Sequence, residues 1–228
     1  YLLHFWMLVG GDSAASIRTP SAIFGLLTVF LTHRLARDLY SGREAIIAAT
    51  LVALSAIQVW YSQEARTYAM FVTLTLLSCL SFVRALEYES VSASRLRRLA
   101  WRIGWVFSTT ALLYSHLYGV FTFMAQCLAY IFVRRDRQSG PGPRLAIGLA
   151  AVVVALFLPW TSIVVGWTFK VSGGFWIGPF GPSMILVAYR DLFGSILLTA
   201  PIGLLAAWSL KSSERWKSVL LASASLGP

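Results

Sequence analysis

The sequence predicts an all-α fold, a polytopic bundle of helices that crosses a membrane several times. Hydrophobic residues make up 57% of the 228 residues and charged residues only 12%, whereas a soluble domain carries about 25% charged residues. Apolar stretches recur along the chain, each near the length of about 20 residues with which a helix crosses about 30 Å of hydrocarbon. These stretches do not alternate between apolar and polar residues with a period of two, which favours helices over strands.

Seven such stretches are predicted to span the membrane, at 20–39, 45–60, 67–86, 99–114, 117–133, 145–165 and 191–210. We interpret residues 1–19 as an outer interfacial segment, because its apolar run is short for a crossing. Asp12 or Ser13 can cap the helix that follows, and Pro20 suits the first turn of a span. Residues 20–217 then hold the spans and 218–228 begin an eighth. The chain 1–228 is therefore expected to be one domain, truncated at both ends, with seven to eight spans.

Lysine and arginine residues gather in alternate connections between these spans. Those connections contain Arg34, Arg37, Arg43, Arg84, Arg95, Arg97, Arg98, Arg102, Arg134, Arg135, Arg137, Arg144, Lys211, Arg215 and Lys217. The intervening connections hold only Arg18, Arg66, Lys170 and Arg190. This asymmetry is typical of cytoplasmic loops under the positive-inside rule. We interpret the net charge of +10 as a topology signal, and we do not expect a nucleic-acid partner.

The same topology predicts which residues face outward, toward a periplasm, a lumen or the cell exterior. Of the nine acidic residues, the outer connections hold only Asp12, Glu64 and Asp191. A reaction that needs a carboxylate on that face therefore has few candidates within this chain. Charged groups at the edge of the hydrocarbon are costly to hold, so they are functional-site hypotheses by default.

Glu64 lies in a segment, 59–68, that places charged and aromatic residues between two apolar runs. On a helix capped by Ser62, Glu64 occupies the first turn and shares one face with Tyr61 and Tyr68. Arg66 is offset from that face and points toward the headgroups. This group could hold a sugar hydroxyl, a metal or a lipid phosphate, which the guanidinium suits. The alternative role for Glu64 is structural, as an anion at a helix N-terminus.

Two further outer segments contain candidate residues. His116 lies in the outer turn 114–119 with Tyr118, where an imidazole can bind a metal, accept a proton, donate a hydrogen bond or be purely structural. The long outer loop 166–190 contains Trp176, whose ring suits either stacking on a sugar or anchoring at the membrane interface. Cys79 and Cys127 fall inside spans and are expected to be packing residues.

Motifs of soluble nucleotide-dependent and zinc-dependent enzymes are absent from the sequence. It contains no Walker loop, no G-x-G-x-x-G after a strand and no His-Glu-x-x-His. ATP and dinucleotide chemistry are therefore not expected. No cofactor is predicted, although a divalent metal stays an open alternative.

Three segments in this order resemble a known family: 18–27, beginning Arg-Thr-Pro-Ser-Ala; 61–69, Tyr-Ser-Gln-Glu-Ala-Arg-Thr-Tyr-Ala; and 114–119, Tyr-Ser-His-Leu-Tyr-Gly. They are similar to bacterial and archaeal membrane glycosyltransferases related to protein O-mannosyltransferases and to the lipid A aminoarabinose transferase. The similarity covers nearly the whole chain. It includes the Phe175-Trp176 loop.

The resemblance implies a type-C glycosyltransferase fold in the plasma membrane, with an outward-facing active site. It implies a sugar carried on a polyprenyl phosphate as donor and a protein, lipid or glycan as acceptor. The family's principal catalytic acid would precede Tyr1, so Glu64 is the catalytic candidate within this chain. The remaining residues carried over by the resemblance have supporting roles. Arg66 would lie beside the lipid phosphate, Tyr61 and Tyr68 would line the cavity, and Asp12 and Arg18 would support the preceding loop.

The predicted function is therefore inverting transfer of a sugar on the outer face of a membrane. Two other classes stay open at this point. A transporter or flippase of lipid-linked sugars would use a similar cavity, although such proteins often show internal repeats and broken spans, which this sequence does not suggest. A noncatalytic scaffold subunit of a glycosylation complex is the third reading.

Overall fold

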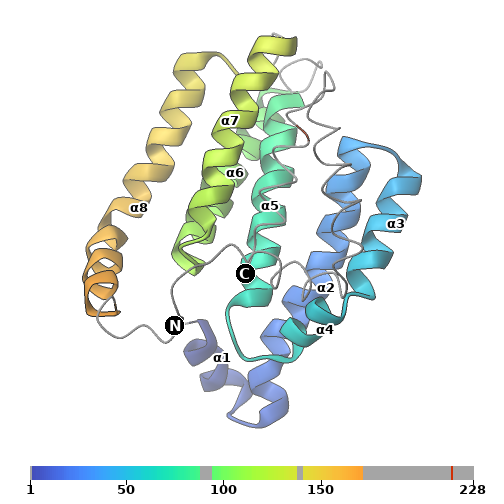
Figure 1. The fold of residues 1–228 in the computed structure, drawn as a ribbon, viewed down its shortest axis with the longest axis vertical. Helices are drawn as coiled ribbons and strands as arrows, with labels where there is room; N and C mark the ends of the chain where they lie inside the picture. Colours follow the sequence, from blue (N-terminus) through green and yellow to red (C-terminus); the bar gives the residue numbers. More distant parts are fainter. Residues whose placement is uncertain (1, 88–93, 138–140, 172–216, 218–228) are drawn as a thin grey trace, which may run out of the picture.

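The computed structural model describes residues 2–87, 94–137, 141–171 and 217, and this part of the chain is helical without any strand (Figure 1). Its helices are α1 (Leu2–Gly10), α2 (Ala14–Leu39), α3 (Gly42–Ala53), α4 (Ala56–Gln63), α5 (Tyr68–Glu87), α6 (Arg95–Ser115), α7 (Gly119–Arg137) and α8 (Pro143–Val171). The predicted all-α class is confirmed. The predicted span at 191–210, the loop around Trp176 and the segment 218–228 lie outside the described residues.

Three of the described helices are long and apolar enough to cross a membrane, over Ala14–Leu39, Tyr68–Leu86 and Pro143–Trp167. A fourth candidate exists if α3 and α4 form one bent span. Helices α6 and α7 coincide with predicted spans but are not among these candidates, and both include several arginines near one end. The count of seven to eight spans therefore stays a prediction.

Two predicted helix boundaries are wrong. The stretch 45–60 is not one helix, because the chain breaks after Ala53, α4 begins at Ala56, and the two helices are bent by 58°. The predicted cap at Ser13 is confirmed, since its hydroxyl accepts a hydrogen bond from the Ser16 N–H, but the span α2 begins directly after this cap, at Ala14, instead of at Pro20. Pro20 thus lies inside the helix, in its second turn.

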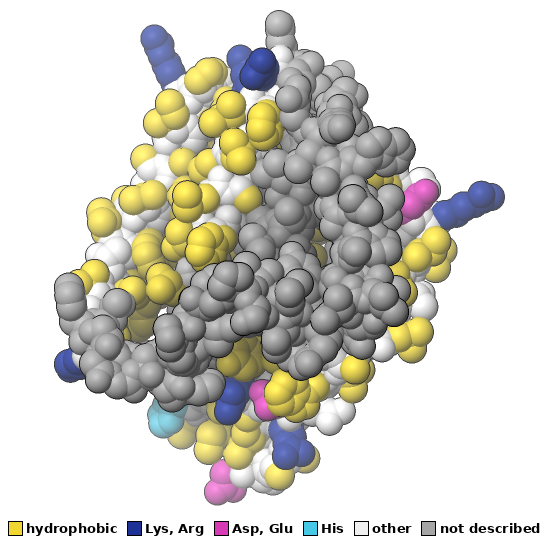
Figure 2. Space-filling view, viewed as in Figure 1, with side chains coloured by type: hydrophobic (Ala, Val, Ile, Leu, Met, Phe, Trp, Pro, Cys, Tyr) yellow, Lys and Arg dark blue, Asp and Glu magenta, His cyan; other side chains and the backbone are white. Residues whose placement is uncertain are grey.

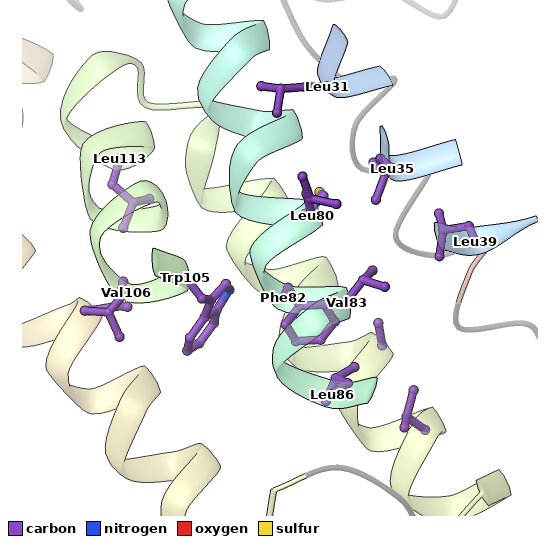
Figure 3. Close-up of a cluster of buried hydrophobic side chains, with 14 residues drawn as sticks. Leu31, Leu35, Leu39, Leu80, Phe82, Val83, Leu86, Trp105, Val106 and Leu113 are labelled. Atoms are coloured by element: carbon purple, nitrogen blue, oxygen red, sulfur yellow. The ribbon is translucent and has the colours of Figure 1, made fainter. Parts of the chain in front are cut away.

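Helix α5 lies at the centre of the bundle, packed against α2 on one side and α6 on the other (Figure 1). Its buried residues Leu80 and Val83 form a hydrophobic core with Leu35 of α2 and Trp105 of α6 (Figure 3). Small polar residues also lie at these contacts, where the hydroxyls of Thr28 and Thr73 and those of Ser78 and Thr109 pair across helices at 2.9 and 2.7 Å. Small side chains let membrane helices approach closely, and their hydroxyl groups bond across the contact.

Successive long helices run in opposite directions, so the connections collect at two ends of the bundle (Figure 1). One end, here the Glu64 end, holds α1, the α4–α5 connection and the α6–α7 turn. The other, here the basic end, holds the α2–α3 turn, the end of α5 and the start of α8. Most described arginines belong to the basic end, where lysine and arginine side chains project from the surface in Figure 2. The alternation of basic connections in the sequence thus corresponds to two ends of the fold.

Candidate functional site

The segment around Glu64 is an extended connection between two helices. Helix α4 ends at Gln63, Glu64 has φ −89° and ψ 139°, and α5 begins at Tyr68. The prediction that Ser62 caps a helix with Glu64 in its first turn is therefore wrong. Ser62 lies in the last turn of α4, where its hydroxyl donates to the Val59 carbonyl at 2.6 Å. Glu64 thus follows a helix C-terminus, where the helix dipole does not favour an anion.

The Glu64 carboxylate is only partly satisfied. Its Oε2 atom is buried and has no hydrogen-bond partner among the described residues. The nearest cation is Arg66, whose Nε lies 3.9 Å from Oε2, and the exposed fraction of the side chain is 24% for Glu64 and 67% for Arg66. Arg66 therefore approaches Glu64, which differs from the prediction that it points away. A buried acceptor without a donor is costly in a folded protein unless a ligand supplies the donor.

Glu64 and Arg66 share an open cavity of about 440 Å³ with Arg18 of α2. Ala14 and Ile17 of α2 and Gln63 of α4 complete much of its lining. The cavity thus brings together one carboxylate and two guanidinium groups from segments that are nearly fifty residues apart in the sequence. Asp12 is exposed in the α1–α2 turn and does not line the cavity. Gln63 was not among the predicted site residues, although it lies within the segment 61–69 that carries the family resemblance.

A row of aromatic rings runs beside this loop, from α4 to the start of α7. The ring centroids of Trp60 and Tyr61 lie 5.7 Å apart, those of Tyr61 and Tyr68 4.9 Å, and those of Tyr68 and His116 6.4 Å. His116 is also 4.8 Å from the ring of Tyr118. The prediction that Tyr61, Glu64 and Tyr68 share one helical face is wrong, because Tyr61 lies in α4, Glu64 in the connection and Tyr68 in α5. The turn between the two helices nevertheless brings the two tyrosine rings into contact.

His116 is held in a defined orientation at the α6–α7 turn. Its Nδ1 accepts a hydrogen bond from the backbone N–H of Tyr118 at 3.3 Å, and its ring packs 5.3 Å from that of Phe71. Burial lowers the pKa of His116 from its ordinary value of 6.5. The neutral ring then carries its proton on Nε2, since Nδ1 is the acceptor. His116 is therefore set up as a hydrogen-bond donor.

Two glycines allow the close backbone contacts that position these segments. A Cβ added to Gly25 of α2 would lie 2.7 Å from Cβ of Ser62, so α4 approaches α2 directly beside the Glu64 connection. A Cβ added to Gly119 would lie 2.9 Å from Cγ of Leu112, which holds the turn containing His116 against α6. Neither contact was predictable from the sequence, because spacing along the chain does not show which distant residue packs against a glycine.

The described residues do not form a metal centre. No group of three or more His, Cys, Asp or Glu side chains lies close enough together in the part of the chain that the structure describes. In the cavity itself, Glu64 is accompanied by two arginines instead of further metal ligands. The positive charges of Arg18 and Arg66 repel a further cation in this cavity.

Comparison with known proteins identifies the family of this chain. A family model described as dolichyl-phosphate-mannose-protein mannosyltransferase matches residues 1–162, a range that includes the Glu64 cavity and the aromatic row. No curated protein and no solved structure matches the chain. Because the family model covers well over half of the 228 residues, the chain belongs to this family of membrane glycosyltransferases that use polyprenyl-phosphate sugars.

Proposed function

We propose that this protein transfers a sugar from a polyprenyl-phosphate donor to an acceptor hydroxyl in the cavity that contains Glu64. The observation that carries the proposal is the buried Glu64 Oε2, which has no hydrogen-bond donor among the described residues and lies in a cavity with Arg18 and Arg66. A sugar or acceptor hydroxyl supplies the donor that this oxygen lacks. The lipid phosphate supplies the negative charge that suits the two arginines.

The reaction is an inverting displacement at the anomeric carbon of the sugar. The acceptor oxygen forms a bond to that carbon while the bond from carbon to the phosphate oxygen breaks. The electron pair of the broken bond leaves with the polyprenyl phosphate, and the acceptor proton passes to a carboxylate. Glu64 is the candidate for that carboxylate within this chain, and general-base assistance of this kind contributes about 10²–10⁴-fold in rate.

Arg18 and Arg66 have a different task, which is to stabilise the phosphate. Negative charge grows on the leaving phosphate as the glycosidic bond breaks, and cations already in position there lower the barrier. Both guanidinium groups line the same cavity as Glu64. Arg66 also approaches Glu64 itself at 3.9 Å, a distance that leaves its N–H groups available for a ligand.

The aromatic row and His116 extend the site toward the α6–α7 turn. Tyr61, Tyr68 and Tyr118 offer rings and hydroxyl groups of the kind that bind sugar faces and sugar hydroxyls. His116 adds an Nε2–H donor, because its Nδ1 is taken by the Tyr118 N–H. Asp12 in the exposed α1–α2 turn and Trp176 are retained as candidates for contacts with the acceptor or the donor lipid.

The cavity faces the outside of the plasma membrane in this proposal, with the chain crossing the membrane several times. The concentration of arginines at the opposite end of the bundle supports this orientation under the positive-inside rule. The acceptor is a protein, a lipid or a glycan, all of which present hydroxyl groups on that face. The sugar specificity is set by residues that line the cavity with Glu64.

The test is transfer of radiolabelled sugar from polyprenyl-phosphate donors in membranes that contain the full-length protein or its Glu64→Gln variant. Transfer should fall at least about 10²-fold in the variant. The matched control is Glu44→Gln, since Glu44 is an exposed acid at the start of α3, at the basic end. That control should retain transfer at the level of the unmodified protein.

A second pair of variants tests whether the two arginines contact the donor phosphate. Arg18→Gln and Arg66→Gln should raise the donor KM and lower kcat, because each guanidinium contacts the phosphate in both the bound and the departing state. Unchanged transfer in Glu64→Gln would remove Glu64 from the working site. Absence of transfer from every polyprenyl-phosphate donor, with a folded protein, would favour a flippase of lipid-linked sugars or a scaffold subunit.

A further inference from the structure

A second cavity lies at the basic end of the bundle, between α2 and α3. It measures about 740 Å³ and is open to the surface. Its lining includes His33 and Arg37 of α2, the Ser41-Gly42 turn and Arg43 of α3. Glu44 and Ile46 complete it. It belongs to the end of the bundle opposite to Glu64, so it is separate from the proposed catalytic site.

The two arginines of this cavity have no acidic partner among the described residues. Glu44, the acid in its lining, accepts a hydrogen bond from the Ser41 hydroxyl. Asp38, the neighbouring acid on α2, is held by Arg84 of α5, whose Nε lies 2.7 Å from its carboxylate. The cavity therefore keeps an excess of positive charge, which favours an anionic ligand.

The start of α3 is capped by an acid of the cavity lining. Ser41 occupies the N-cap position, but its side chain makes no cap hydrogen bond to the helix. Its hydroxyl donates to Glu44 instead. The Glu44 carboxylate also accepts hydrogen bonds from the backbone N–H groups of Ser41 and Glu44, so this acid caps α3 and leaves Arg37 and Arg43 as the cationic donors of the cavity.

An apolar surface leads away from the cavity along α3. Ile46, which lines the cavity, is 61% exposed, and Ile47, Leu51 and Leu54 follow it with similar exposure. Helices α3 and α4 together have the length and composition of a bent membrane span, and in that placement this surface faces hydrocarbon. A soluble phosphate would use the cavity alone, whereas a phospholipid would use the cavity and the apolar surface together.

We infer that this cavity binds the phosphate of an anionic glycerophospholipid, with its acyl chains lying along the exposed side chains of α3. Arg37 and Arg43 donate to the phosphate oxygens. The lipid belongs to the leaflet at the basic end, which the positive-inside rule assigns to the cytoplasmic side, where anionic headgroups attract such clusters. This lipid is distinct from the sugar donor, which binds at the other end of the bundle.

The experiment is titration of the purified full-length protein in detergent with fluorescent phosphatidylglycerol, compared with fluorescent phosphatidylcholine. The unmodified protein should bind phosphatidylglycerol at least tenfold more tightly than phosphatidylcholine. The double variant Arg37→Gln/Arg43→Gln should lose that preference. The matched control is Arg95→Gln/Arg144→Gln, which removes two charges from the same end of the bundle but outside the cavity lining, and it should retain the preference.

A second variant guards against a loss of binding that results from misfolding. A side chain at Gly42 meets nothing within 4 Å, and an acid in the first turn of a helix is favourable for folding. Gly42→Asp should therefore keep its thermal stability while losing phosphatidylglycerol preference. Equal binding of the two lipids by the unmodified protein, or an unchanged preference in both variants, would overturn the inference. Displacement of phosphatidylglycerol by millimolar inorganic phosphate would assign the cavity to a soluble anion instead.

This outcome is separable from the proposed function. Glu64→Gln should leave phosphatidylglycerol binding unchanged, since Glu64 lies at the other end of the bundle. Failure of sugar transfer in all variants would leave the lipid result intact. Failure of lipid binding would likewise leave the assignment of the Glu64 cavity intact.

Discussion

The indole N–H of Trp6 donates a hydrogen bond to the backbone carbonyl of Ser16, with a distance of 2.9 Å from Nε1 to the oxygen. Ser16 lies four residues before Pro20, so its carbonyl is the one that a residue with an N–H at position 20 would bond inside the helix. Trp6 of α1 supplies the donor that Pro20 lacks. A proline in the second turn of α2 thereby becomes an attachment point for α1 beside the Glu64 end.

Replacing Trp6 with phenylalanine tests this attachment. Trp6→Phe keeps an aromatic ring but removes the donor, so the Ser16 carbonyl loses its partner. The free energy of unfolding should fall by about 1 kcal/mol, the usual net contribution of one hydrogen bond. Thermal unfolding in detergent measures the change. The control Trp167→Phe alters an exposed tryptophan near the end of α8 and should leave the unfolding temperature unchanged. An equal decrease of the unfolding temperature in both variants would contradict a specific role for Trp6.

The contact between Gly25 and Ser62 predicts a steric effect on the candidate site. Gly25→Ala places a Cβ 2.7 Å from the Ser62 Cβ, so α4 must move away from α2. Overpacking of this kind costs about 1–3 kcal/mol. Since Ser62 lies two residues before Glu64, sugar transfer should also fall, and more steeply than thermal stability.

Gly148→Ala is the matched control for that variant. Gly148 is also a helical glycine, but a Cβ there meets nothing within 4 Å. Alanine has the higher helix propensity by about 1 kcal/mol, so this variant should be as stable as the unmodified protein or more so. Full sugar transfer by Gly25→Ala would show that the position of α4 against α2 does not matter for the site.

Much of the candidate site was predictable from the sequence, because its residues cluster where apolar runs are interrupted. Glu64, Arg66 and His116 are conspicuous for that reason, and the structure brings the first two into one cavity and the third against Tyr68. The boundary of α4 was not predictable, since segment 59–68 contains neither proline nor glycine to end a helix. The close approach of α2 and α4 at Gly25 is a tertiary contact that spacing along the chain does not reveal.

The fold class was predictable for a similar reason, while two helix boundaries were not. An apolar run of membrane length predicts a helix, because its backbone N–H and C=O groups can find hydrogen-bond partners in hydrocarbon only within the segment itself. The break between Ala53 and Ala56 falls in a mostly apolar stretch, where Ser55 occupies the N-cap position of α4 without a side-chain cap hydrogen bond and is therefore a weak local signal. The cap at Ser13 was predictable, but the continuation of α2 through Pro20 was not, because the distant Trp6 supplies the donor that makes an internal Pro20 tolerable.

His116 should confer a dependence of stability on pH. Burial places its pKa below the ordinary value of 6.5, so between the two values the unfolded chain binds more protons than the folded one. The free energy of unfolding should therefore decrease as the pH falls below about 6.5. His116→Gln, which keeps a side-chain amide in the turn, should flatten this dependence. Unfolding temperatures measured from pH 5 to pH 8 test the prediction, and an identical slope in the variant would contradict it.

Gln126 connects three helices in the core, and its removal should destabilise the bundle. Its amide nitrogen donates to the Ser78 hydroxyl of α5, and its amide oxygen accepts from Trp105 Nε1 of α6, both at 2.8 Å. Gln126→Leu leaves the buried Trp105 N–H without an acceptor, a loss of about 1–3 kcal/mol. Thr75→Val is the contrasting variant, because the buried Thr75 hydroxyl has no hydrogen-bond partner among the described residues. Thermal unfolding should therefore show a lower transition temperature for Gln126→Leu and an unchanged or higher one for Thr75→Val. If Gln126→Leu were as stable as the unmodified protein, apolar packing alone would hold α5, α6 and α7 together.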